Sequence, residues 1–285
     1  MPEGRRVRLL GVAVLSCSTA ACGGGAPLLH PAHALPAGRV SAGAGVSGQF
    51  VFRSDEEARA PGPPPPMGEL RQRGVEEAVA RVALSPGVAP WVGVRGGLGA
   101  RTEAGLTYTG RTVRADARHA FGGDSVALSV GAGASGVFAR STDQSEEGSP
   151  PPPQERAPRA GPDLSANGFG FDLPIIVGWR STASVVQVWA GARGGFERLA
   201  GDLPLVPVEG PPPPAASFTA TRWWGGGLLG AAVGLPPVMV AVELDVAYQS
   251  ASGSATFPGP GAPPPTAGTV TGLTVAPAGA IIGKF

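Results

Sequence analysis

The chain has 285 residues, of which 42% are hydrophobic, and its formal net charge at pH 7 is +1. That apolar fraction is enough for a sizeable buried or lipid-facing surface, which argues against a chain disordered throughout. The chain has no basic excess and no long Lys/Arg cluster to neutralise phosphates, which argues against nucleic acid as a partner. Both cysteines, Cys17 and Cys22, lie near the start. The rest of the chain therefore has no disulfide, thiolate nucleophile or cysteine-based metal site.

The first residues have the layout of an exported protein. Three arginines in the first eight residues precede an apolar stretch over 9–15, and small residues then lead to Cys22. This layout predicts a secretory signal peptide over 1–21, because the apolar stretch is too short to span a membrane as a helix.

The sequence Ala20-Ala21-Cys22, followed by three glycines, resembles a bacterial lipoprotein signal. The resemblance implies a lipid on Cys22, which would become the mature N-terminus. Thr19 departs from the pattern, because a leucine is expected three residues before the cysteine. Lipidation at Cys17 and ordinary cleavage near Ala20 stay open as alternatives. We expect residues 22–37 to form a tether between this anchor and the folded part.

Proline-rich patches punctuate the rest of the chain, and each one separates two segments of strand character. They lie at 58–68, 146–162, 209–214 and 257–265. Such runs can neither pair in a sheet nor continue a helix, so they are predicted to be loops.

The segments between these patches alternate apolar and polar residues with a period of two. In "FGFDLPIIVGWR", one face carries Phe169, Leu173 and Trp179, while Asp172 and Arg180 lie on the other. Many segments run to roughly 12 to 16 residues, whereas strands of soluble proteins usually have about 5 to 6. Membrane-spanning strands need about 9 to 11 residues in the apolar layer, so segment length favours a membrane barrel.

One uncharged stretch, 225–242, is long enough for a membrane-spanning helix. Pro236 and Pro237 lie in its middle and would break such a helix. We therefore predict two strands joined by a tight turn.

The joins between the predicted strands alternate between short and long. Short joins are expected between 104–121 and 125–140, between 168–181 and 184–198, and between 217–235 and 238–250. Long proline-rich joins follow residues 140, 199 and 250. This alternation describes an up-and-down meander with short turns at one end and long loops at the other.

An even number of strands requires one more strand near the N-terminal half. Segment 74–85 has an alternating pattern, although Val75, Val79 and Val82 also have helical spacing. We interpret it as a strand. The predicted fold is all-β: over 38–285, an antiparallel up-and-down transmembrane β-barrel of about ten strands with long proline-rich outer loops.

The last strand carries a second resemblance. Leu273, Val275, Ile281 and Phe285 share a face, and an apolar last strand ending in Phe is similar to the C-terminal signature of bacterial outer-membrane β-barrel proteins. Pro277 departs from it by removing a backbone donor. The resemblance implies a bacterial outer-membrane location, contact with outer-membrane lipid, and recognition of Phe285 by the barrel-assembly machinery. The alternative is a secreted β-sandwich or lipocalin-like binding protein, whose apolar faces would meet in one shared core.

In a membrane barrel, the polar faces point into the lumen. The ionisable positions that we expect there are Arg95, Arg114, Asp116, Arg118, Asp172, Arg180, Arg193, Glu197, Arg222, Glu243 and Asp245. Ten strands enclose a narrow interior. We therefore expect these nearly balanced charges to form ion pairs that close the lumen, with an anion-binding ladder along 107–121 as the alternative. Arg111 falls on the opposite face unless a bulge at Gly110 shifts the register.

No motif for catalysis is present. His30 and His33 lie in the expected tether, and His119 lies at the expected periplasmic end of its strand. We expect no enzymatic activity, cofactor or metal, and a structural or surface-interaction role through the long loops. The alternative is a transporter or narrow channel for small or hydrophobic molecules.

Overall fold

The computed structural model describes residues 25–53, 66–141, 164–203, 215–235 and 237–285. These residues form ten strands, an α-helix and one π-helical turn. The helical elements are α1 (Met67–Val79) and η2 (Ala80–Leu84). The strands are β1 (Val40–Arg53), β2 (Gly87–Gly99), β3 (Thr102–Tyr108), β4 (Thr112–Gly122), β5 (Val126–Ser141), β6 (Leu164–Arg180), β7 (Val186–Leu203), β8 (Ala216–Leu235), β9 (Val238–Thr256) and β10 (Thr266–Lys284).

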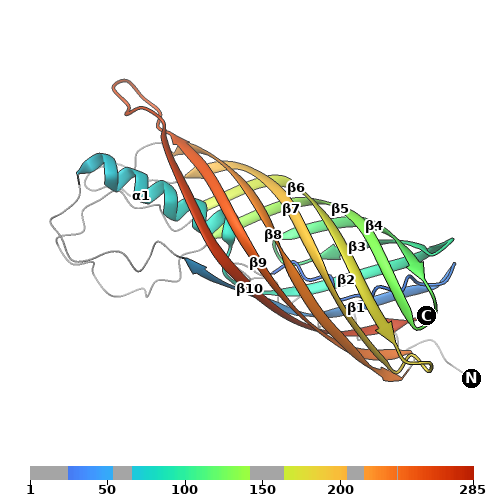
Figure 1. Cartoon of the computed structure of the whole chain (residues 1–285). Coiled ribbons are helices and arrows are strands. Elements are labelled where there is room, and N and C mark those ends of the chain that lie inside the picture. Colours follow the sequence, from blue (N-terminus) through green and yellow to red (C-terminus); the bar gives the residue numbers. More distant parts are fainter. Residues whose placement is uncertain (1–24, 54–65, 142–163, 204–214, 236) are drawn as a thin grey trace, which may run out of the picture.

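The strands close into an antiparallel barrel (Figure 1). Each strand pairs with its neighbours in the sequence, and β1 pairs with β10 to complete the sheet. At this seam, a Cβ atom on Gly45 would lie 1.9 Å from the carbonyl oxygen of Gly279, so the strands approach closely only because residue 45 is glycine. The structure confirms the predicted ten-stranded up-and-down barrel.

The outer surface of the barrel is apolar on every strand. Large exposed hydrophobic side chains, with at least one from each strand, include Phe52, Val94, Leu106, Val113, Phe138, Leu173, Val188, Leu229, Val242 and Ile281. Alternation along each strand directs these residues outward and their neighbours into the lumen.

The two ends of the barrel differ. The terminal end, where Val40 and Phe285 lie, carries the short connections β2–β3, β4–β5, β6–β7 and β8–β9. The loop end carries the long connections β1–β2, β5–β6, β7–β8 and β9–β10 and the short β3–β4 turn.

The predicted strand over 74–85 is wrong, because this segment belongs to α1 and η2. The predicted strand over 104–121 is wrong too, because its residues belong to β3 and β4, joined by a reversal at 109–111. Gly110, with a φ of 75°, allows that tight turn. One strand fewer and one strand more leave the total at ten.

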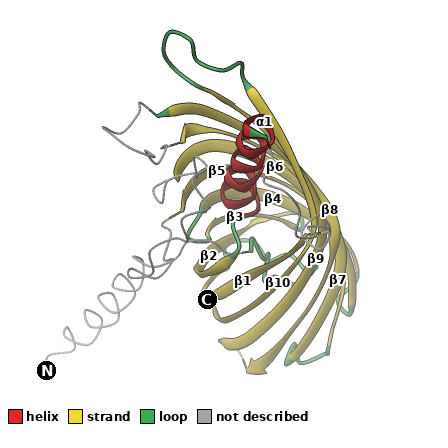
Figure 2. Ribbon diagram, turned by 90° about the vertical axis from the view of Figure 1, so that its left-hand side faces the viewer, coloured by secondary structure: helices red, strands yellow, loops and turns green. Residues whose placement is uncertain are grey.

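The lumen helix, residues 67–84, enters the barrel from the loop end (Figures 1 and 2). Its first turns project beyond the strands, and its last turns lie inside. Val75, Val79 and Val82 are buried against the lumen faces of β5 to β10, where side chains such as Leu199 and Phe218 line the wall. Because this half of the lumen is apolar, the valines that suggested a helix by spacing find a matching surface.

A second insertion enters from the terminal end. The N-terminal lumen segment, residues 25–39, runs along the lumen to mid-barrel, where the amide of Gly25 donates to the carbonyl of Gly48 at 3.3 Å. Leu28, Leu29 and Ala32 are buried against wall residues that include Trp91, Ile176 and Trp189. The described part of the expected 22–37 tether therefore packs inside the barrel, while the expected signal peptide and Cys22 lie outside the described residues.

Candidate functional site: the barrel lumen

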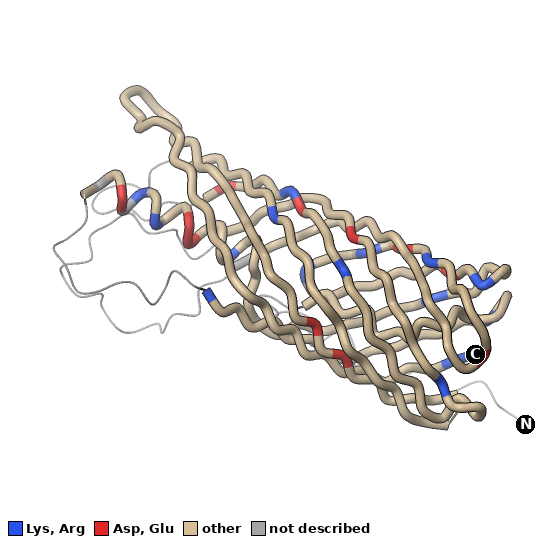
Figure 3. The backbone as a smooth tube through the Cα atoms, viewed as in Figure 1, with Lys and Arg blue, Asp and Glu red and all other residues tan. Residues whose placement is uncertain are grey.

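The structure gathers the predicted ionisable positions along the inner wall. Nine of them are buried: Arg95, Arg114, Asp116, Arg118, Asp172, Arg193, Glu197, Arg222 and Glu243. Asp245 is partly buried and lines a small cavity together with Arg193. Arg180 lies partly exposed at the terminal end, where its Nε donates to the Asp124 carbonyl at 2.6 Å. Figure 3 shows that charged residues are sparse along the strands, so these inward positions hold most of the strand charge.

One ion-pair network begins at Glu103. Its carboxylate accepts from Arg95 Nε at 2.5 Å and from Arg118 Nε at 2.8 Å. Arg95 also reaches Asp116 Oδ1 at 2.5 Å, and Asp116 accepts a further bond from Arg114.

The same network continues to Asp172. Arg114 donates to both of its carboxylate oxygens, at 2.8 and 2.9 Å, and Arg193 Nε donates to Oδ2 at 2.9 Å. Buried charges are tolerable only when paired and hydrogen-bonded in this way. Each of the four arginines in this network, Arg95, Arg114, Arg118 and Arg193, therefore bonds to at least one of its three carboxylates.

A second network lies closer to the loop end, around Glu197. Its carboxylate accepts from Arg111 at 3.0 Å and from Arg222 at 2.6 Å. Arg222 also donates to Gln249 Oε1 at 3.1 Å, and Gln249 donates to Thr274 Oγ1 at 2.6 Å.

This second network caps the C-terminal end of the lumen helix. The last carbonyls of a helix have no partner within it and need donors from elsewhere. Arg111 donates to the Val82 carbonyl at 2.9 Å, Arg222 donates to the Ala83 carbonyl at 2.7 Å, and Gln49 donates to the Leu84 carbonyl. Polar wall residues thus hold the helix end at mid-barrel.

Wall carboxylates hold the amides of the N-terminal lumen segment. Glu243 accepts from the amides of Leu28 at 2.6 Å and Leu29 at 3.0 Å, and from Trp189 Nε1 at 2.9 Å. Glu103 accepts from the amide of Leu35 at 2.8 Å.

Wall arginines hold the carbonyls of the same segment. Arg118 donates to the carbonyls of Pro31 and, at 3.2 Å, His33, while Arg193 donates to the carbonyl of Ala26. Both insertions are therefore fastened through their backbones, since extended and helix-end backbone must find partners when buried.

Two members of the networks were not expected from the sequence. Glu103 is fully buried, but it lies just before the predicted strand 104–121 and was therefore not considered. The pairing of β3 with β4, which places Glu103 opposite Arg118, would have identified it. Arg111 was expected on the outward face unless a bulge at Gly110 shifted the register, and the reversal at Gly110 does turn it inward. The glycine at 110, in "YTGRT", was the cue for that turn.

The histidines occupy separate environments. His119 Nδ1 lies 2.9 Å from Thr102 Oγ1, and its ring packs edge-on against Phe121. Burial, followed by the positive charge of Arg118, holds the pKa of His30 well below its usual range. Burial and Arg180 lower the pKa of His33 to about 4, so both rings in the N-terminal lumen segment are neutral at pH 7.

Within the described ranges, no three His, Cys, Asp or Glu side chains gather as a metal site would require. No helix among the described residues is long and apolar enough to cross a membrane.

Fold and lumen together define a class: a closed, ten-stranded antiparallel barrel, apolar outside, with a helix and an extended segment fastened in its lumen by ion-pair networks. No protein-family model matches the chain, and no curated protein sequence matches it.

Solved structures with related architecture exist. Neisserial surface protein A is 12% identical, with a TM-score of 0.29, over 87% of this chain and 99% of that one. The monoaromatic hydrocarbon channel CymD is 9% identical, with a TM-score of 0.30, over 88% of this chain and 89% of that one. At these values, neither structure carries an argument about what this chain does.

Proposed function

We propose that this protein is a bacterial outer-membrane β-barrel with a closed lumen and a structural or surface-interaction role. The outward apolar side chains on all ten strands support a lipid environment. In water, an apolar belt around the whole barrel would far exceed the few hundred Å² that monomeric soluble proteins expose in one patch. A secreted sandwich or lipocalin-like protein would instead turn these residues toward a shared core.

The lumen carries the second part of the proposal. An open pore needs wall charges that face water. Here Arg114 and Arg193 bond to Asp172, and Arg222 bonds to Glu197 and to the lumen helix. This pairing is the observation on which the closed state rests, and it favours a structural role over transport.

The proposal also covers how the protein reaches its place. A signal peptide over 1–21 and a lipid on Cys22 would export and anchor it. Phe285 is exposed at the terminal end, and its backbone pairs with Val40 across the seam at 2.8 and 3.1 Å. This position suits a residue that the assembly machinery recognises until β1 and β10 close the barrel.

Conductance in planar lipid bilayers tests the closed lumen. We expect the folded wild-type protein to show no steady conductance, and a heat-unfolded sample in the same detergent controls for leakage. Steady wild-type conductance that changes with Arg114→Gln or Arg193→Gln would overturn the closed lumen and favour a transporter or narrow channel.

The absence of enzymatic activity belongs to the same proposal. His119 is engaged with Thr102 and Phe121 at the terminal end, away from the long loops. Hydrolase activity of the folded protein that maps to acidic residues of the long loops would contradict this part.

A further inference from the structure

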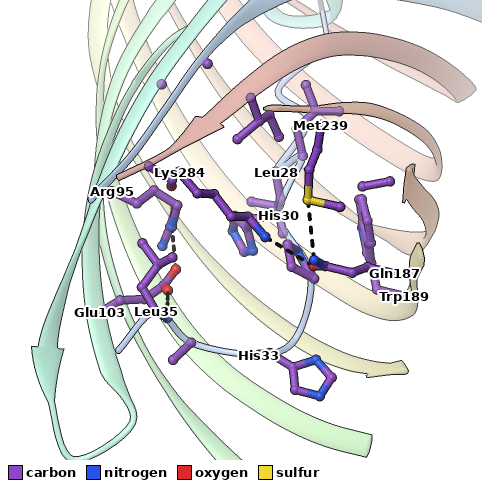
Figure 4. Close-up of a pocket in the computed structure, with 18 of the residues that line it drawn as sticks. Leu28, His30, His33, Leu35, Arg95, Glu103, Gln187, Trp189, Met239 and Lys284 are labelled. Atoms are coloured by element: carbon purple, nitrogen blue, oxygen red, sulfur yellow. Dashed lines mark hydrogen bonds and ion pairs between the residues drawn. The ribbon is translucent and has the colours of Figure 1, made fainter. Parts of the chain in front are cut away.

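A cavity of about 170 Å³ lies at the terminal end, between the N-terminal lumen segment and the barrel wall. Figure 4 shows side chains from both pointing toward this space, with Leu28 and His30 on the segment and Gln187, Trp189, Met239 and Lys284 on the wall. Arg180, which lines the opening, keeps 30% of its side chain exposed. The cavity is therefore reachable from the terminal end.

Much of the cavity lining is apolar. Leu28, Trp91, Trp189, Met239 and Ile282 line it and are all buried. An engineered protein cavity of about 150 Å³ is known to hold benzene, so this volume suits one aromatic ring or a chain of similar size.

The charged side chains around the cavity indicate which charge the polar group of a ligand would carry. The guanidinium groups of Arg95 and Arg118 bond to Glu103, and Arg180 bonds to Asp124. On the lumen side of the wall, Glu243 accepts three N–H bonds, from Leu28, Leu29 and Trp189.

Lys284, the only lysine in the chain, differs from these arginines. Among the described residues its ammonium has one hydrogen-bond partner, Gln187 Oε1 at 3.5 Å. Gln187 is held in turn by a contact with Met239 Sδ at 3.4 Å. Lys284 therefore offers a cation inside the cavity that has no ion pair with a carboxylate of the described residues.

We infer that this cavity binds a small amphipathic carboxylate, such as a single-ring or short-chain acid. Its carboxylate bonds to Lys284, and its apolar body packs between Trp91, Trp189 and Met239. A charged head and a ring-sized body match a cavity lined by one cation and by apolar side chains. The site goes beyond the proposed function, because a closed barrel needs no ligand at this end.

Binding of benzoate to the folded full-length protein, measured by calorimetry, tests the inference, with toluene as the uncharged probe of the same shape. We expect saturable benzoate binding and weaker toluene binding. Lys284→Gln keeps hydrogen bonding but removes the charge, and it is expected to weaken benzoate binding at least about tenfold while leaving toluene unchanged. Lys284→Arg should restore most of the affinity.

The matched control is Arg39→Gln, which removes a cation from the exposed surface of the same end. If Lys284→Gln does not fold, Lys284→Met, which also removes the charge but keeps an apolar stem of similar length, is expected to weaken benzoate binding to the same extent. No benzoate binding, equal binding of benzoate and toluene, or equal losses in Lys284→Gln and Arg39→Gln would each overturn the inference.

Discussion

Glu197 is the residue through which the lumen networks can be tested most sharply. Its carboxylate is the acidic partner of both Arg111 and Arg222, at 3.0 and 2.6 Å, and both arginines cap the lumen helix. Glu197→Gln leaves two buried guanidinium groups without a counter-charge. Removing one partner of a buried ion pair costs about 3 to 5 kcal/mol. Because the glutamine oxygen still accepts one bond, we expect about 3 kcal/mol of lost unfolding free energy.

The assay is equilibrium unfolding in guanidinium chloride, with the protein in lipid vesicles and tryptophan fluorescence as the signal. The control is Glu69→Gln, which removes the acid of an exposed pair with Arg73 and is expected to cost at most about 0.5 kcal/mol. Adding Arg111→Met to Glu197→Gln should recover stability, because it removes one uncompensated cation. A Glu197→Gln loss as small as that of Glu69→Gln would refute the reasoning.

Three further predictions follow from the seam and the N-terminal lumen segment. Gly45→Ala should abolish the heat-modifiable gel band of the folded barrel, because its Cβ would overlap the Gly279 carbonyl, whereas Gly68→Ala, with open space around it, should keep the band. Glu243→Gln should speed proteolysis within residues 25–39, since a neutral group binds the segment's amides more weakly; an unchanged cleavage rate would contradict this. The lowered pKa of His33, about 4, means that the unfolded state binds more protons between pH 4 and 6.5, so stability is full above that range and falls as the pH drops through it. His33→Gln should flatten this dependence in unfolding measured from pH 7.5 to 5, and a profile equal to wild type would exclude His33 as its source.

The barrel could be predicted from the sequence because strand alternation is a local signal. The outward row of β6, from Phe169 to Trp179, is visible by counting every second residue. The two strands on either side of Pro236 and Pro237 were also predicted correctly, since proline excludes the competing helix.

The lumen helix could not be recognised with the same rules. In this segment Val75, Val79 and Val82 have helical spacing, while Ala78, Ala80, Val82 and Leu84 alternate as in a strand. Only the apolar wall of β5 to β10, assembled from distant residues such as Leu199 and Phe218, selects the helix. An even strand count did require one more strand. The β3–β4 turn at Gly110 supplied it by dividing the predicted strand 104–121 into two.

The partners of the polar wall residues lie far apart in the sequence. Alternation identifies Arg222 as inward-facing, but its bonds to Glu197 and to the Ala83 carbonyl depend on the closed barrel. The burial of the N-terminal lumen segment could not be predicted either, because Leu28 and Leu29 belong to no periodic pattern. Their amides bond to Glu243, which lies more than two hundred residues away in the sequence.

The most direct test of the central claim is fractionation of the expressing bacterium, with the membrane fraction run on a gel before and after heating. We predict that the protein sediments with the outer membrane and that its gel band shifts on heating, as expected for a closed barrel surrounded by lipid. A soluble periplasmic or secreted protein without a heat-modifiable band would contradict the membrane barrel, and with it the assignment of the apolar side chains to lipid.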